Sequence, residues 1–303
     1  MNTKHAQYVL TVLQEGSITN AARKLFVSQP SLSQMIKLAE NNLGAPIFNR
    51  NTDPITLTYA GQKYVEAAKQ VLAIDSNLAR EIEEITHEEQ GTIRLGIPVQ
   101  RAMQVMPYVF PRFRKLFPMV KLELNEFGSA TVENMVLEGA LDLACTTTSP
   151  RHEELHYTLI ENEELVLLSG RNTAIAKRIP SGTEISISEA KGESFISSKS
   201  GHSVRTTQDR LFAMYDIQPD ILLETSSIEV AKRTTIASDG VMICPINYIE
   251  MSPELHPYCC IYPIKGIENQ RGFYLCHRKD FYLTKYMKSF IQLLTTMEKP
   301  VLH

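Results

Sequence analysis

The chain has 303 residues, of which 43% are hydrophobic and 21% charged, and its formal net charge is −3. This length exceeds one ordinary hydrophobic core and predicts two or three domains, while the composition excludes disordered and collagen-like chains. No apolar run reaches the roughly 18 residues of a membrane span, and the N-terminus lacks a secretion signal, so we expect a cytoplasmic protein with no membrane contact.

The N-terminal part contains three short helical patterns separated by turns. Apolar residues recur at helical spacing in residues 4–14 and stop at Gly16, a usual helix terminator. After a second short pattern, Ser28 is a candidate cap and Pro30 fits the first turn of a third helix, which ends at Gly44. A short helix, a tight turn and a helix with a polar face form the layout of a helix-turn-helix.

Two short strand patterns, residues 46–50 and 55–58, follow the third helix. Between them lies Asn51-Thr52-Asp53-Pro54, which is rich in turn-forming residues. Strand, turn and strand after a helix-turn-helix predict a wing. We therefore expect residues 1–60 to form a winged helix-turn-helix domain that is mainly α-helical.

A long helical pattern begins after Gly61, and we assign residues 61–90 to a linker helix and hinge, with a polar hinge sequence at 87–91. An amphipathic helix packed on its own domain is one interpretation. We favour a dimer interface, because the apolar spacing is that of a coiled coil over about three heptads and no other long helix nearby could cover it. The apolar positions are Tyr64, Ala68, Val71, Leu78, Ile82 and Ile85, with Asp75 at the one polar position.

From Thr92 onward, strand and helix patterns alternate, which predicts an α/β fold with parallel sheets and helices on both faces. The number of residues left, about 200, favours two lobes over one large sheet. We assign residues 91–303 to this domain, with lobe I at 91–163 and 266–303 and lobe II at 164–265. The predicted strands are 93–97, 121–126, 141–146, 165–169, 194–197, 220–224, 240–244, 258–263 and 272–276, and the last helix is 283–297.

The segment Glu15–Arg50 reads EGSITNAARKLFVSQPSLSQMIKLAENNLGAPIFNR. It closely resembles GSxTxAAxxLxxSQPSxSxxIxxLExxLGxxLFxR, the signature of the LysR family of bacterial transcription regulators. Residues 57–61, LTYAG, match the family's LTxAG, and so many fixed spacings are a strong signal. Weaker matches lie at residues 91–98, 137–143 and 224–245. The resemblance implies an N-terminal winged helix-turn-helix that binds an operator, and a C-terminal domain like periplasmic binding proteins that senses a small molecule.

The sequence departs from the family signature at two places. Ala39 stands where leucine is usual, and Leu38 occupies a position that is normally polar. Gln34 stands where many members carry arginine. The second departure would alter base preference and leave DNA binding in place.

The third helix offers the chemistry of a recognition helix, which reads DNA through side chains near its N-terminus. Gln pairs with adenine, Ser and Lys suit phosphates or base acceptors, and Arg50 in the wing can enter the minor groove. A solvated polar face is the alternative. Residues 1–65 contain six Lys and Arg residues and three acidic residues, whereas the rest of the chain contains 25 Lys and Arg residues and 31 acidic residues. A basic N-terminal domain on an acidic remainder suits DNA contact through the N-terminal domain. We expect DNA contacts from Ser28, Gln29, Pro30, Ser31, Ser33, Gln34, Lys37 and Arg50.

An effector cavity is expected where strand ends meet helix starts between the lobes. Hydroxyls, helix amides and the Arg101 guanidinium at these places favour a small anionic or polar effector, first a carboxylate-bearing metabolite and second an inorganic oxyanion. For each Ser or Thr, a helix cap is the alternative. We expect effector contacts from Pro98, Val99, Gln100, Arg101, Ser129, Thr147, Thr148, Ser197, Ser198, His202 and Thr225.

Other functions have less support in the sequence. A small-molecule-binding protein or an enzyme on the same α/β scaffold is the alternative, but the chain has no Gly-rich phosphate loop, HExxH or GxSxG motif. A transporter's binding protein would not need residues 1–91. We therefore expect no enzymatic activity; the partners are a double-stranded DNA operator, a small-molecule effector, a second copy in a homodimer or homotetramer, and RNA polymerase.

The five cysteines fit neither a metal motif nor a disulfide framework. Cys145, Cys244 and Cys276 lie in apolar runs, where free cysteine is usually a small buried hydrophobic residue. The adjacent Cys259 and Cys260 point to opposite faces of a strand, a poor geometry for a disulfide. We expect no metal site and no cofactor.

Overall fold

The structure is a computed structural model, and it describes residues 2–49, 52, 54–86, 90–266 and 271–297. The chain divides into two compact units. The first unit comprises Met1–Glu88 and Asp280–Thr284, and the second comprises Glu89–Lys279 and Lys285–His303.

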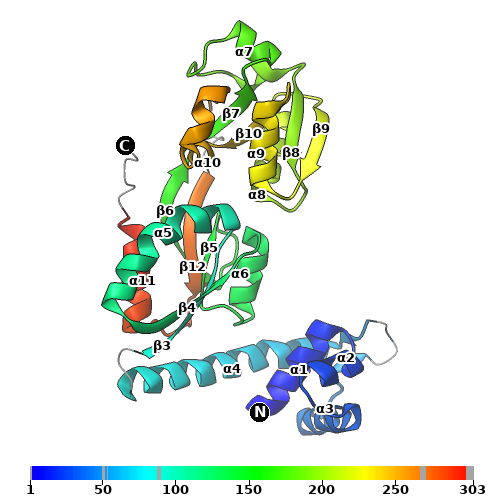
Figure 1. Ribbon diagram of the computed structural model, residues 1–303. Helices are drawn as coiled ribbons and strands as arrows, with labels where there is room; N and C mark the ends of the chain where they lie inside the picture. Colours follow the sequence, from blue (N-terminus) through cyan, green and yellow to red (C-terminus); the bar gives the residue numbers. More distant parts are fainter. Residues whose placement is uncertain (1, 50–51, 53, 87–89, 267–270, 298–303) are drawn as a thin grey trace. The chain divides into compact units, whose positions relative to one another are not determined.

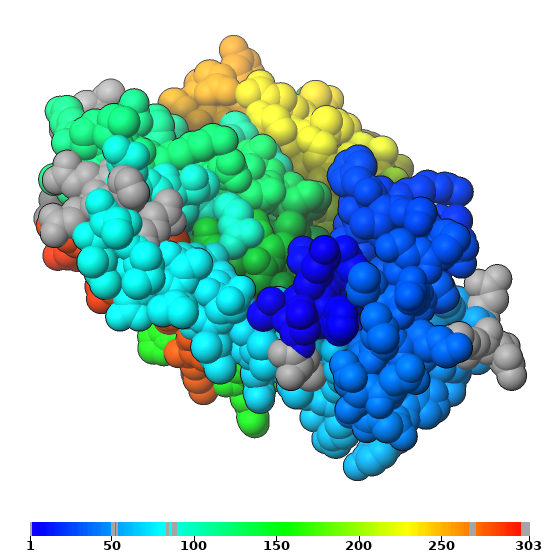
Figure 2. Space-filling model, turned by 90° about the horizontal axis from the view of Figure 1, so that it is seen from below, coloured from blue at the N-terminus to red at the C-terminus, as the bar shows by residue number. Residues whose placement is uncertain are grey.

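Three short helices form the N-terminal part of the first unit (Figure 1): α1 (Thr3–Glu15), α2 (Ile18–Lys24) and α3 (Gln29–Leu43). Gly16 and Gly44 end α1 and α3 in the left-handed conformation, with φ of 61° and 77°, as the sequence predicts. Figure 2 shows the atoms of this part, in blue, as one continuous surface. Its core includes Val9, Val12, Ala21, Leu32, Ile36 and Ile47.

The wing is a short hairpin of β1 (Phe48–Asn49) and β2 (Thr56–Leu57), which pair antiparallel. The Asn49 side chain donates to the Thr56 hydroxyl at 3.2 Å and to the Leu57 carbonyl at 3.0 Å. The Glu40 carboxylate accepts from the backbone N–H of Ile47 at 2.9 Å, which ties the end of α3 to the strand that follows.

Helix α4 (Tyr59–Thr86) has two different apolar faces along its length. Tyr64 and Ala68, 7% and 0% exposed, pack into the core of their own unit, so the prediction that they belong to a dimer interface is wrong. Farther along the helix, Leu78 and Ile82 are 57% and 50% exposed. The predicted coiled-coil spacing therefore combines an intramolecular contact with an uncovered apolar stripe.

Residues 280–284 complete the first unit beside the middle of α4. The Asn77 side chain accepts from the backbone N–H of Tyr282 at 3.1 Å and donates to the Asp280 carbonyl. The Arg80 guanidinium lies 4.4 Å from the centroid of the Phe281 ring, a cation–π contact. Both contacts hold this segment against one face of the helix.

The second unit contains two five-stranded sheets (Figure 1). The first sheet has the order β4-β3-β5-β12-β6, with bounds Met119–Asn125, Gln90–Gly96, Leu143–Thr146, Arg271–Arg278 and Leu155–Glu163. The second has the order β11-β7-β10-β8-β9, with bounds Cys259–Pro263, Leu165–Gly170, Val241–Pro245, Ser194–Ser198 and Asp220–Thr225.

The helices of the second unit follow strand ends, and they are α5 (Val99–Leu116), α6 (Ser129–Leu137), α7 (Ala174–Arg178), α8 (Ser203–Met214), α9 (Ile228–Ala237), α10 (Asn247–Glu250) and α11 (Lys285–Thr295). Two 3₁₀ turns lie at Ile187–Ala190 and Pro253–Tyr258.

Both sheets are mixed, which corrects the expectation of parallel sheets. β3 pairs parallel with β4 and β5, but β12 pairs antiparallel with β5 and β6. In the second sheet β7 runs antiparallel to β10 and β11. Strands β6 and β7 are joined by a single residue, Glu164, and belong to different sheets, so the chain passes directly from the first sheet into the second.

Two further expectations fail near the element boundaries. Strand β6 is absent from the predicted strands. Gln90 and Gly91 belong to strand β3 and not to a hinge, and the remaining predicted hinge residues, 87–89, lie outside the described residues. No helix in the described part of the chain is long and apolar enough to cross a membrane.

Candidate functional site

The N-terminal end of α3 presents a polar outer face. The Ser28 hydroxyl accepts from the backbone N–H of Ser31 at 3.3 Å, the capping bond expected of that residue, and Pro30 lies in the first turn. Leu32, Ile36 and Ala39 turn inward. The side chains of Ser28, Gln29, Pro30, Ser31, Gln34 and Lys37 are exposed and Ser33 is half-buried.

Exposure and capping give this face the properties of a DNA-contacting surface. The exposed amides of Gln29 and Gln34 and the ammonium of Lys37 are all available donors. The first backbone N–H groups of a helix attract phosphate. Leu38 is also exposed, and Arg50, expected in the minor groove, lies outside the described residues.

A cavity of about 370 Å³ lies within the second unit. Residues that follow strands of both sheets line it, and four helices begin at it: α5, α6, α8 and α9. A helix N-terminus carries partial positive charge, so the four helix starts favour negative charge in the cavity. The lining residues are Pro98, Val99, Gln100, Glu126, Phe127, Gly128, Ser129, Thr147, His202, Ser203, Val204, Ser226, Ser227, Ile228 and Tyr248.

Several residues predicted to contact an effector lie on this cavity. They are Pro98, Val99, Gln100, Ser129, Thr147 and His202. Each follows a strand end and begins or precedes a helix, except Thr147, which directly follows β5. Their meeting at one place agrees with the rule that ligands bind at the strand ends of open α/β sheets.

Four other predicted contacts do not line the cavity. Thr148 donates to the Glu133 carboxylate at 2.7 Å, and the Ser197 hydroxyl accepts from the Gln208 amide at 2.6 Å. The Thr225 hydroxyl accepts from a backbone N–H at 3.2 Å, and Ser198 is buried. The Thr148, Ser197 and Thr225 hydroxyls support neighbouring loops and helices, and the Ser198 hydroxyl is buried without a hydrogen-bond partner.

Arg101 does not face the cavity, contrary to its predicted role. Its side chain is 0% exposed, and its guanidinium donates to Glu161 and Glu163 of strand β6. The guanidinium also lies 4.1 Å from the centroid of the Phe273 ring. Two carboxylates and an aromatic face thus satisfy this charge inside the protein, which leaves it unavailable as a direct ligand of an anion.

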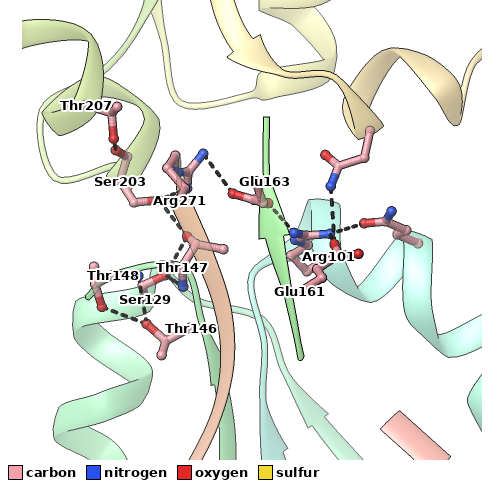
Figure 3. A network of polar contacts seen from close by, with 12 residues as sticks. Arg101, Ser129, Thr146, Thr147, Thr148, Glu161, Glu163, Ser203, Thr207 and Arg271 are labelled. Carbon is pink, nitrogen blue, oxygen red and sulfur yellow. Dashed lines mark hydrogen bonds and ion pairs between the residues drawn. The ribbon is translucent and has the colours of Figure 1, made fainter. Parts of the chain in front are cut away.

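A second buried arginine lies closer to the cavity wall (Figure 3). Arg271, the first residue of β12, donates to the Ser203 hydroxyl at 2.7 Å, and Ser203 lines the cavity. The Nη1 atom of Arg271 is 3.3 Å from the Glu163 carboxylate, an ion pair without a well-aligned hydrogen bond. Glu163 therefore lies between the two arginines.

Three hydroxyls in the cavity wall form a hydrogen-bonded chain (Figure 3). The Ser203 and Thr147 oxygens are 2.7 Å apart, and the Thr147 and Ser129 oxygens are 3.1 Å apart. Ser129 also accepts from the backbone N–H of Thr147 at 3.0 Å. The chain connects the starts of α6 and α8 with the end of β5.

Five polar lining residues are absent from the expected effector contacts: Glu126, Ser203, Ser226, Ser227 and Tyr248. Ser203 directly follows a predicted residue, His202, so the strand-end rule would have found it with one further position. Tyr248 lies in the short helix α10, and no sequence motif marks it. Burial raises the pKa of the Tyr248 phenol, which therefore stays a hydrogen-bond donor at neutral pH.

The buried cysteines are confirmed as small hydrophobic residues. Cys145, Cys244 and Cys276 are each at most 1% exposed, and all five cysteines are free. Burial raises the pKa of Cys145 and of Cys244 to about 12, so neither thiol is ionised at neutral pH. Within the described residues, no group of three or more His, Cys, Asp and Glu side chains could hold a metal ion.

Two family models match the chain. Residues 3–62 match the model described as bacterial regulatory helix-turn-helix protein, lysR family, and residues 86–298 match the LysR substrate binding domain. Among curated relatives, YybE of Bacillus subtilis (strain 168), an uncharacterized HTH-type transcriptional regulator, is 26% identical over 245 residues, which cover 81% of this chain and 82% of that protein. The HTH-type transcriptional regulator CbbR of Rhodospirillum rubrum is 25% identical over 279 residues, which cover 92% of this chain and 90% of that protein.

Solved structures share the fold along nearly the whole chain. A full-length OxyR variant from Pseudomonas aeruginosa superposes with a TM-score of 0.68 at 20% identity, covering 97% of this chain and 93% of that one. Full-length CbnR complexed with its target DNA gives a TM-score of 0.57 at 19% identity, and the match covers 97% of this chain and 99% of that one.

Proposed function

The chain belongs to the LysR family of bacterial helix-turn-helix transcription regulators, and from this we propose how it acts: α3 reads an operator, and the cavity of the second unit binds a small anionic effector that modulates operator binding or activation. The observation that carries the DNA-binding role is the exposed polar face of α3, capped by Ser28. Gln29, Gln34 and Lys37 provide base and phosphate contacts, and Arg50 of the wing adds a minor-groove contact.

The cavity supports the effector role through its size and its electrostatics. Its volume of about 370 Å³ is sufficient for a small metabolite. Hydroxyls and four helix N-termini supply hydrogen-bond donors, whereas Val99, Phe127 and Ile228 supply apolar surface. A carboxylate with an apolar body fits this mixture better than an inorganic oxyanion, which has no apolar part to bury.

We assign operator binding to residues 1–60, dimerisation to residues 61–90 and effector sensing to residues 91–303. The exposed apolar stripe at the end of α4 supports a homodimer or a pair of dimers. As a regulator of transcription the protein would work in the cytoplasm, where its operator DNA is, with RNA polymerase as a further partner.

Selection from random DNA tests the operator role and identifies the bound sequence in the same experiment. The full-length chain is incubated with a pool of duplexes carrying a random central segment, and bound DNA is amplified over several rounds. We expect enrichment of a sequence with two half-sites, because a dimer presents two copies of α3.

Paired variants make the test specific to α3. Gln34→Ala should change the enriched bases at one position of each half-site. Gln70→Ala, an exposed glutamine on α4, should leave the enriched sequence unchanged. A pool that remains random with the unmodified chain refutes the proposed function.

A further inference from the structure

The hydroxyl chain in the cavity wall has one proton more than its protein partners can accept. A Ser or Thr hydroxyl carries one proton and two acceptor lone pairs. The three hydroxyls of Ser129, Thr147 and Ser203 make two contacts with one another, and each contact uses one proton whichever oxygen donates. One hydroxyl proton is therefore left over.

The outer partners of this chain cannot take that proton, because both are donors. The Arg271 guanidinium donates to Ser203 at 2.7 Å, and the backbone N–H of Thr147 donates to Ser129 at 3.0 Å. Within residues 90–266 and 271–297, no other group bonds to these three hydroxyls. Since all three side chains line the cavity, the remaining proton is available to an acceptor inside it.

Arg271 controls this arrangement from outside the cavity. A guanidinium is always charged and has donors only, so the Ser203 oxygen must accept from it. This leaves the Ser203 proton for Thr147 or for the cavity. Arg271 is held in place by Glu163, and its side chain is only 4% exposed. Its charge polarises the hydroxyls that bond to it in sequence.

The remaining lining residues restrict the charge and size of the ligand. Among the described lining residues, Glu126 is the one carboxylate and none is lysine or arginine, which disfavours an anion with more than one charge. Val99, Phe127, Val204 and Ile228 provide apolar surface. A monocarboxylate with an apolar body satisfies both conditions.

We propose that Arg271 is a positioning residue that makes the Ser129–Thr147–Ser203 chain a donor to the carboxylate of a monoanionic, largely apolar effector. This inference rests on the proposed effector role of the cavity. It assigns the selectivity for anions to an arginine that the ligand does not touch, acting through Ser203.

The test measures how well the full-length chain distinguishes carboxylates from neutral analogues of the same shape. Benzoate, phenylacetate and hexanoate are each titrated against their own amides by calorimetry, at constant ionic strength. A charge-assisted hydrogen bond is stronger than a neutral one by enough for roughly tenfold selectivity. We expect at least one carboxylate to bind about tenfold more tightly than its amide.

Variants separate positioning from simple structural support. Arg271→Met should bring the carboxylate-to-amide affinity ratio close to one, and Arg271→Lys, which keeps a cationic donor, should restore it in part. Ser203→Ala leaves the Arg271–Glu163 ion pair in place and should also bring the carboxylate-to-amide affinity ratio close to one. This variant tests the proposal if Arg271→Met does not fold. Thr207→Val is the matched control, since the Thr207 hydroxyl donates to the Ser203 backbone carbonyl at 3.0 Å and lies outside the hydroxyl chain.

Three results would overturn the inference: no carboxylate of the panel binds, the unmodified chain binds carboxylate and amide equally, or Ser203→Ala keeps the selectivity. The DNA selection needs no effector, so the two proposals fail separately. A chain that enriches an operator but shows no carboxylate selectivity refutes the inference alone. A chain that selects carboxylates but enriches no DNA refutes the proposed operator role alone.

Discussion

The hydroxyl oxygen of Ser203, on helix α8, lies 2.7 Å from the hydroxyl oxygen of Thr147, directly after strand β5. Helix α8 packs on β8 and β10 of the second sheet, whereas β5 belongs to the first, so this bond connects the two sheets at the cavity wall. An effector that contacts either hydroxyl acts on this connection. A ligand shifts a conformational equilibrium only through such differential contacts.

Operator binding should weaken steeply as salt increases, because each neutralised phosphate releases a counterion. Lys37→Ala should lower the slope of log affinity against log salt by about one, and should weaken binding to all sequences similarly. Fluorescence anisotropy with a selected duplex measures both. Lys115→Ala, an exposed lysine on α5 in the second unit, is the control, and equal slopes for the two variants would place Lys37 away from the DNA.

The uncovered stripe of α4 should carry the dimer interface. Leu78→Glu combined with Ile82→Glu introduces two charges at positions where at least half of the side chain is exposed. The monomer should therefore remain folded. We expect a monomer in sedimentation velocity, and much weaker operator binding because two half-sites are no longer engaged together.

Gln62→Glu combined with Gln70→Glu adds the same charges at exposed polar positions of α4 and should remain dimeric. A dimeric Leu78→Glu, Ile82→Glu variant would place the interface elsewhere in the chain.

Arg101→Ala should destabilise the second unit. Removing this buried guanidinium leaves Glu163 as a buried charge that has lost its principal partner, a change that costs about 3–5 kcal/mol in comparable pairs. Urea unfolding followed by circular dichroism measures the effect. Arg178→Ala removes an exposed arginine that pairs with Glu189 at 3.0 Å, and should cost less than about 1 kcal/mol.

The sequence alone predicts a different outcome for Arg101→Ala, namely loss of the effector response with DNA binding intact. An Arg101→Ala protein of normal stability that no longer binds carboxylates would favour the sequence-based interpretation over the structure.

Local signals predicted the first unit well because they act over a few residues. Gly16, Ser28 and Gly44 mark the helix ends, and each fulfils its expected role in the structure. The spacing of Tyr64 and Ala68 was misleading, because burial against the same chain and burial against a second copy require the same apolar periodicity.

The candidate cavity could be predicted in part, for a similar reason. The strand-end rule places a residue near the cavity, but the direction of its side chain depends on distant partners. Arg101 turns away because Glu161 and Glu163 lie on strand β6, about 60 residues farther along the chain. That strand alternates too poorly between apolar and polar residues to be recognised, with only its two ends and no regular face buried.

Gly61→Ala should destabilise the first unit strongly. A Cβ at Gly61 would lie 2.0 Å from the backbone carbonyl oxygen of Ile47, so the start of α4 would have to move away from the wing. We expect a loss of about 3 kcal/mol or more in the free energy of unfolding.

Gly44→Ala is the informative comparison for Gly61→Ala. Gly44 has a φ of +77° but nothing within 4 Å of the added Cβ, so only backbone strain of about 1 kcal/mol is expected. Equal losses for the two variants would show that close packing at Gly61 has no special effect.

The buried imidazole of His277 should make the stability of the second unit depend on pH. Burial, together with the neighbouring His156 ring at 5.2 Å, holds the pKa of His277 below its ordinary value of 6.5. The unfolded chain therefore binds a proton more readily than the folded chain. Above pH 6.5 His277 does not lower the free energy of unfolding. As the pH falls from 6.5 through the lower pKa that His277 has in the folded chain, the free energy of unfolding decreases.

Urea unfolding between pH 7.5 and pH 5.5 measures this loss, whose slope from one histidine reaches at most about 1.4 kcal/mol per pH unit. His277→Gln should flatten the pH dependence, because the replacement does not titrate. His156→Gln should reduce it, since the like-charged neighbour no longer opposes protonation. His5→Gln changes a half-buried histidine of the first unit and should leave the transition of the second unit unaltered. A His277→Gln protein with the unmodified pH dependence would assign the effect to other groups.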